Sequence, residues 1–173
     1  MSKMGLYPLT PKAKYKSYKG DMNGTVKNLL LKKVVDEEKQ KTIYKRNFNT
    51  TSRNEIWSTD VSKFHIGAGK QYLSPNFEQT KDMLDKALSK HKHLEGLIFH
   101  SDQGWQYQMD EYHKVLKDKG IIQSMSRKGN CFDNSPMENF FGKMKNEMFY
   151  GFEYTFKSLD ELQNVMEDYK DKF

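Results

Sequence analysis

Residues 135–145 constrain this chain most, because they combine a helix-start signal with charged side chains on one helix face. Ser135 and Glu138, three residues apart, form a capping box, and Pro136 suits the first position of a helix. The pattern predicts a helix with Ser135 as its N-cap. Lys145 follows Glu138 by seven residues, so the two side chains share a face. On this motif alone, Glu138 is explained simply as a capping residue.

The excess positive charge lies in the first fifty residues. The net charge is +6, with 12 Lys/Arg against 4 Asp/Glu in residues 1–50 and 17 against 19 in residues 51–173. Basic segments of this kind meet polyanions, most often nucleic acid, although a solvated tail has the same composition. We place a boundary in the polar stretch 47–54, which predicts a basic linker or arm over 1–50 and one globular domain over 51–173.

Cysteine, histidine and hydropathy patterns exclude several classes of protein. The single cysteine, Cys131, leaves no internal disulfide and favours a reducing compartment such as the cytoplasm. No apolar run approaches the roughly 20 residues of a membrane span, and the N-terminus lacks a signal-peptide core. The five histidines do not have zinc-site spacing, so a bound metal would be held by oxygen ligands.

The globular part has the pattern of an α/β domain. Residues 56–66 alternate and are rich in β-formers, which predicts a strand with Asp60 in its middle. A Gly-rich turn leads to a short return strand over 70–74, and Asn76 caps a helix with an apolar stripe. Residues 28–35 fit a short helix or a strand equally well.

A second strand and helix follow in the same order. The apolar run at 94–100 predicts a buried strand, which puts Asp102 at its carboxyl end, where open α/β sheets bind ligands. By itself, an Asp in that position is also explained as a turn residue. Residues 108–119 predict a helix, and residues 121–125 another short strand. The inward residues of this helix are predicted to be Met109, Tyr112 and Leu116.

Three acids therefore stand at three positions, mid-strand Asp60, strand-end Asp102 and first-turn Glu138. Brought together, three carboxylates repel one another unless a cation neutralises them, and oxygen ligands suit Mg²⁺ or Mn²⁺. Two such ions could stabilise the attacking and leaving oxygens of a phosphodiester. The residues alone thus indicate a metal-dependent phosphoryl-transfer site on an α/β domain.

At this point the chain resembles the DDE transposases of bacterial insertion sequences, which are relatives of retroviral integrases. The matching segments are residues 57–61, 100–107, 124–131 and 133–141, in the order of the family and with its spacing of 35 residues between the second and third acids. Each segment alone is weakly specific, whereas the set is highly specific.

The resemblance implies a ribonuclease H-like mixed sheet flanked by helices, with Asp60, Asp102 and Glu138 binding two Mg²⁺ or Mn²⁺ ions. In that family, water cleaves the transposon end and the freed 3′-hydroxyl attacks target DNA. The implied partners are DNA and a second copy or a full-length transposase, at the bacterial nucleoid. The arm would correspond to the linker after a DNA-reading domain. The residues expected to contact DNA are Lys145, Lys143, Arg127, Lys128, Asn130 and Asn134.

One departure from the family affects the expected activity. Two antiparallel strands should follow the Asp60 strand, but residues 70–74 reach only roughly 17 Å, enough for one. We expect about one strand to be lacking, the C-terminus to be shortened, and catalysis by this chain to be weak. The alternatives are a non-catalytic remnant that binds DNA or a transposase partner, and a nuclease of the same fold without strand transfer.

Overall fold

The computed structural model describes residues 26–37, 41–67, 69–73 and 77–172. The first 25 residues of the basic arm and the predicted N-cap Asn76 lie outside these ranges.

A three-stranded parallel sheet forms the centre of the fold. β3 (Ile56–Ser58) pairs with β6 (Ile98–Ser101), which pairs on its other side with β7 (Ile122–Met125). The apolar run predicted as a buried strand is β6, and the short strand predicted over 121–125 is β7. Both predictions are confirmed.

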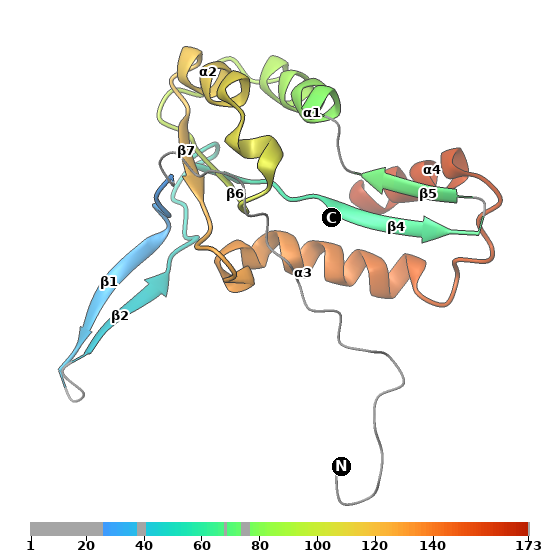
Figure 1. Ribbon diagram of the computed structural model, residues 1–173, viewed down its shortest axis with the longest axis horizontal. Coiled ribbons are helices and arrows are strands. Elements are labelled where there is room, and N and C mark those ends of the chain that lie inside the picture. Colours follow the sequence, from blue (N-terminus) through green and yellow to red (C-terminus); the bar gives the residue numbers. More distant parts are fainter. Residues whose placement is uncertain (1–25, 38–40, 68, 74–76, 173) are drawn as a thin grey trace, which may run out of the picture.

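Two helices cover this sheet through one apolar cluster. α1 (Phe77–Ser89) and α2 (Asp110–Asp118) lie at the top of the view in Figure 1. The prediction that Met109 points inward is wrong, because Met109 is the N-cap of α2 and is 38% exposed. A 3₁₀ turn over Trp105–Gln108 ends just before it, so α2 starts later than predicted. The buried cluster comprises Leu84, Leu88, Leu94, Leu97, Phe99, Tyr107, Tyr112, Leu116, Ile121 and Met125.

A second cluster forms under an antiparallel hairpin. β4 (Ser62–Ile66) pairs with β5 (Gly69–Leu73), which confirms the predicted return strand. α3 (Ser135–Met144) continues into a π-helical turn at Lys145–Phe149, and α4 (Leu159–Lys170) follows. The buried residues of this cluster are Phe64, Ile66, Met144, Phe149, Phe156, Leu162 and Met166.

The strand predicted over residues 56–66 is interrupted at its middle. It divides into β3 and β4, which belong to separate sheets, so Asp60 lies between two strands and not within one. The prediction of a mid-strand position is therefore wrong. Since aspartate is disfavoured inside strands, a break at this residue is physically reasonable.

Most of residues 28–35, for which the sequence allowed a helix or a strand, lie in a third β-sheet. β1 (Leu31–Asp36) pairs with β2 (Lys41–Arg46) in a two-stranded antiparallel sheet. Figure 1 shows this hairpin extending away from the rest of the chain. The strand alternative for residues 28–35 is thus correct, and part of the basic arm is folded.

The predicted α/β class is confirmed by these elements. Among the described helices, none has the length and apolarity needed to cross a bilayer.

Candidate active site

The parallel pairing of β3 with β6 places two of the predicted acids at the same sheet edge. Ser58 is the register partner of His100, and the Thr59 N–H donates to the His100 carbonyl at 2.8 Å. Continuing this register by two residues beyond each strand places Asp60 near Asp102, in agreement with the contribution of the Asp102 charge to the raised pKa of Asp60. Neighbouring strands lie about 4.8 Å apart, so this register brings the two residues close together.

Local hydrogen bonds hold each carboxyl group. Oδ1 of Asp60 accepts from the Val61 N–H at 2.7 Å, and Oδ1 of Asp102 accepts from the Gly104 N–H at 2.9 Å. Both aspartates are half-buried. Each carboxyl is therefore oriented by backbone before any ligand arrives.

The start of α3 differs from the predicted capping box. The N-cap is Asn134, Ser135 already has helical dihedral angles, and no side-chain cap bond forms. The prediction of Ser135 as N-cap is wrong because the 3₁₀ turn at Cys131–Asn134 leads directly into the helix. Glu138 consequently makes no reciprocal capping contact, which removes the simplest structural explanation for its presence.

Asn134 connects α3 to the strand that precedes Asp60. Its side chain is buried, and Nδ2 donates to the Thr59 carbonyl at 3.1 Å. Glu138 lies four residues later and therefore on the same helix face. Glu138 is exposed, and its charge raises the pKa of Asp60, so the two carboxyl groups lie within electrostatic range of each other.

Lys145 occupies the same helix face two turns further on. Its Nζ lies 5.2 Å from the ring centroid of Phe64 on β4. Burial lowers the pKa of Lys145, while the nearby Asp60 charge acts in the opposite direction. Lys145 also begins the π-helical turn, a type of distortion that is frequent at functional sites.

These groups affect one another electrostatically. The pKa of Asp60 is raised to about 6, chiefly by burial, and Asp102 and Glu138 raise it further. The Val61 N–H and Lys145 act in the opposite direction. Burial also raises the pKa of Asp102. Within the described ranges, however, no three His, Cys, Asp or Glu side chains form a group that could hold a metal ion together. The metal-binding triad therefore stays a prediction.

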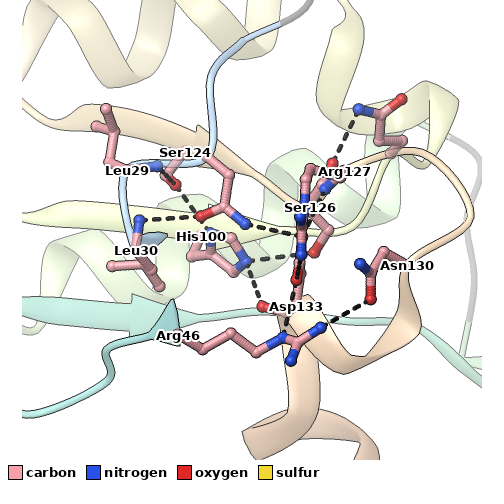
Figure 2. A network of polar contacts seen from close by, with 11 residues as sticks. Leu29, Leu30, Arg46, His100, Ser124, Ser126, Arg127, Asn130 and Asp133 are labelled. Carbon is pink, nitrogen blue, oxygen red and sulfur yellow. Dashed lines mark hydrogen bonds and ion pairs between the residues drawn. The ribbon is translucent and has the colours of Figure 1, made fainter. Parts of the chain in front are cut away.

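The loop expected to face DNA is largely occupied by internal contacts, shown in Figure 2. Arg127 donates to the Asp133 carboxylate from Nε at 2.8 Å, from Nη2 at 2.9 Å and from its backbone N–H at 3.1 Å. Asn130 accepts a hydrogen bond from Nη2 of Arg46 at 3.0 Å. Of the predicted DNA-contacting set, Lys128, Lys143 and Arg127 are exposed, Lys145 and Asn130 are half-buried, and Asn134 is buried. The Arg127 side chain, although exposed, is engaged with Asp133.

Asp133 is the residue that sequence reasoning missed. Its side chain is fully buried and also accepts from Nε of Arg46 at 2.9 Å and from Nδ2 of Asn28 at 3.1 Å. Burial alone would raise the pKa of Asp133, but the hydrogen bonds from Arg127 and Arg46 outweigh it and hold that pKa well below its usual range. No local signal could have paired Arg46 with a residue 87 positions away.

His100 completes this network at the centre of the sheet. Its Nε2 lies 2.9 Å from the Asp133 carbonyl, which can only accept, so Nε2 carries the proton. Nδ1 then accepts from the Ser124 hydroxyl at 2.9 Å, and Ser124 Oγ accepts from the Leu29 N–H at 3.0 Å. Burial lowers the pKa of His100, in agreement with a neutral ring. The network thus connects β6, β7, the 3₁₀ turn before α3 and the base of the hairpin (Figure 2).

Sequence comparison places two segments of this chain in a known domain family. Residues 74–131 and residues 138–173 each match an integrase core domain family. An uncharacterized transposase-like protein of Haemophilus influenzae is 39% identical to the chain, covering 98% of it and 79% of that protein. The putative transposase InsK of Escherichia coli insertion element IS150 is 38% identical over 90% of the chain and 56% of its own length.

The chain therefore belongs to the insertion-sequence transposases that contain an integrase core domain. This family acts in DNA transposition, and integrase core domains generally depend on divalent metal. The chain spans little more than half the length of the InsK protein.

Solved structures of retroviral integrases were also matched. The HTLV-2 integrase catalytic core domain in complex with magnesium is 16% identical, with a TM-score of 0.43, covering 57% of this chain and 71% of that one. A chain in the simian T-cell lymphotropic virus intasome in complex with PP2A regulatory subunit B56 gamma gives a TM-score of 0.47 at 16% identity, covering 57% of this chain and 41% of that one.

Proposed function

We propose that this chain is the catalytic core of a DDE transposase, which cleaves DNA at transposon ends and joins them to target DNA. The proposed catalytic residues are Asp60, Asp102 and Glu138. The observation that supports this most is the convergence of Asp60 and Asp102 at one sheet edge, with Glu138 and Lys145 within electrostatic range of Asp60.

The three carboxylates suit hard divalent cations. Asp60 is half-buried and its charge is disfavoured by both neighbouring acids, a situation that Mg²⁺ or Mn²⁺ would relieve. We propose that the three acids hold two such ions, which would polarise the phosphodiester and lower the pKa of the attacking water.

The basic side chains would position DNA around this site. Lys145 reaches toward Asp60 and would bind the phosphate next to the scissile bond, while Lys128 and Lys143 are exposed on the same loop and helix. We further propose that residues 1–50 are a basic arm that adds sequence-independent affinity, and that the chain works on bacterial chromosomal DNA together with a second copy or a full-length transposase.

A strand-transfer assay tests this function. The purified 173-residue chain would be incubated with Mn²⁺ and short duplexes carrying the ends of the parent element. Asp60→Asn and Glu138→Gln should each abolish joining. Asp110→Asn, which neutralises an exposed acid on α2, should leave it unchanged. Lys145→Ala should lower joining more than it lowers general DNA affinity. Joining that survives Asp60→Asn would disprove the assignment.

A non-catalytic role is the second candidate, and one observation favours it. The chain breaks from β3 to β4 at Asp60, so this carboxyl is not held inside a continuous strand. Catalytic groups need placement within about 0.5 Å, so a loosened Asp60 would lower activity strongly. DNA binding without metal-dependent joining, in a chain that is otherwise folded, would select this alternative.

A further inference from the structure

We propose that the β1–β2 hairpin is a rigid DNA-binding arm whose Lys32 and Lys45 contact backbone phosphates outside the active site. This inference rests on the proposed function, since it assumes that DNA is the substrate. It identifies which part of the basic arm binds and how that part is held.

The hairpin has the exposure that a binding surface needs. In the portion of the chain that the structure describes, β1 and β2 pair only with each other. All six residues of β2 are exposed, and Figure 1 shows the hairpin extending beyond the body of the domain. Such a two-stranded ribbon gains little stability from burial, and its exposed surface is available for contacts with another molecule.

The charge on one face of the hairpin favours an anion. Lys32 and Lys45 are direct cross-strand partners, so their side chains lie on the same face, next to the Val34–Ile43 pair. Neither lysine has an ion-pair partner among the described residues. Like charges directly opposite each other are destabilising, and a phosphate between them would remove that cost. Lysine is a flexible point charge and suits contacts that do not depend on base sequence.

Arg46, the residue after Lys45 in β2, holds the hairpin to the domain. Side chains alternate along a strand, so Arg46 faces the side opposite to Lys45. Its guanidinium bonds the buried Asp133 at 2.9 Å and lies 5.5 Å from the ring centroid of Phe132. The base of the hairpin is closed by the Asn47 N–H donating to the carbonyl of buried Leu30 at 2.8 Å.

Asp133, which binds Arg46 of the hairpin, also belongs to the segment that leads into α3. Asp133 immediately precedes Asn134, the N-cap of the helix that carries Glu138. The orientation of the hairpin and the start of α3 are therefore fixed by one carboxylate. DNA bound along the hairpin would be held in a defined position relative to the proposed active site, which a flexible tail could not achieve.

The test is the salt dependence of duplex binding by the full chain in EDTA, where no joining can occur. Wild type and the Lys32→Gln/Lys45→Gln double variant would be titrated with a 30-base-pair duplex by fluorescence anisotropy between about 50 and 200 mM NaCl. Loss of two phosphate contacts should flatten the slope of log affinity against log salt by about 1.8. The matched control, Lys90→Gln/Lys117→Gln, removes two exposed lysines elsewhere and should leave the slope unchanged.

Two outcomes would overturn the proposal, an unchanged slope in the hairpin variant and an equal flattening of the slope in the control. An unchanged slope together with a change in self-association by sedimentation would make the hairpin a protein contact. Because the titration needs no metal, a flattened slope in a chain that fails to join DNA would keep the hairpin assignment while rejecting catalysis.

Discussion

Arg46 donates from Nε to Oδ1 of Asp133 at 2.9 Å, and this ion pair joins the basic hairpin to the segment that starts the proposed catalytic helix. Arg127 pairs with the other carboxylate oxygen at 2.8 Å. The Asp133 side chain is fully buried, whereas both arginines are partly exposed. A buried carboxylate with so many donors is costly to disturb, because removing one partner leaves the others unsatisfied.

The Asp133→Asn substitution should therefore destabilise the domain by about 3 kcal/mol. An amide in this position presents an NH₂ group to donors on Arg46 and Arg127. Urea unfolding of the full chain at pH 7 measures the effect, and Asp168→Asn on the exposed surface of α4 is the matched control. Equal stability of the two variants would mean that the network in Figure 2 contributes little.

A comparison of wild type with the Asp133→Asn variant also gives a pH test. Hydrogen bonds from Arg127 and Arg46 hold the pKa of Asp133 below its usual range in the folded state, against the effect of burial. A depressed carboxyl pKa stabilises the fold above the unfolded value of about 3.9, and this stability is lost as pH falls below it. The difference in urea midpoint between wild type and Asp133→Asn should be constant from pH 5 to 8 and shrink toward pH 3. A difference that grows on acidification would contradict this assignment.

Sequence predicted the elements that have a local signal. The apolar run of β6 predicted a buried strand, and the apolar stripe of α1 predicted a helix. The few residues between the Gly-rich turn and α1 correctly predicted a single return strand, β5. The family motifs located the three acids. The incorrect predictions arise from tertiary structure. The 3₁₀ turn before Ser135 displaced the N-cap of α3 by one residue. Asp133 was overlooked because its charge partner Arg46 lies on a strand that is distant in sequence.

Asn134→Ala should lower catalysis much more than stability. The substitution removes the donor to the Thr59 carbonyl, a loss of about 1–3 kcal/mol if that carbonyl stays unpaired. It also releases the contact between the strand before Asp60 and the helix of Glu138. We expect joining to fall about 10- to 100-fold, since small misplacements of reacting groups have effects of that size. Single-turnover joining and urea unfolding, measured on the same preparation, separate the two effects.

Asn134→Asp provides the sharper comparison for this position. The aspartate keeps the size of the side chain but places an acceptor against the Thr59 carbonyl and adds a buried charge near Asp60. It should be at least as impaired as Asn134→Ala in both measurements. Full activity in either variant would show that the bond from Asn134 does not position the site.

Two N-terminal truncations should separate the charge of the arm from its structural role. Removal of residues 1–25 deletes five lysines and one aspartate but none of the residues that bond Asp133. It should flatten the salt dependence of DNA binding by up to about 4.5 in slope, if each lysine contacts one phosphate, and leave the urea midpoint near that of wild type. Removal of residues 1–48 also deletes Asn28 and Arg46, which leaves Asp133 paired with Arg127 alone. That truncation should lower the urea midpoint as well as the DNA affinity.

Equal stability of the two truncated chains would show that the hairpin is not held through Asp133. An unchanged slope after removal of residues 1–25 would exclude the five lysines of that segment as DNA contacts.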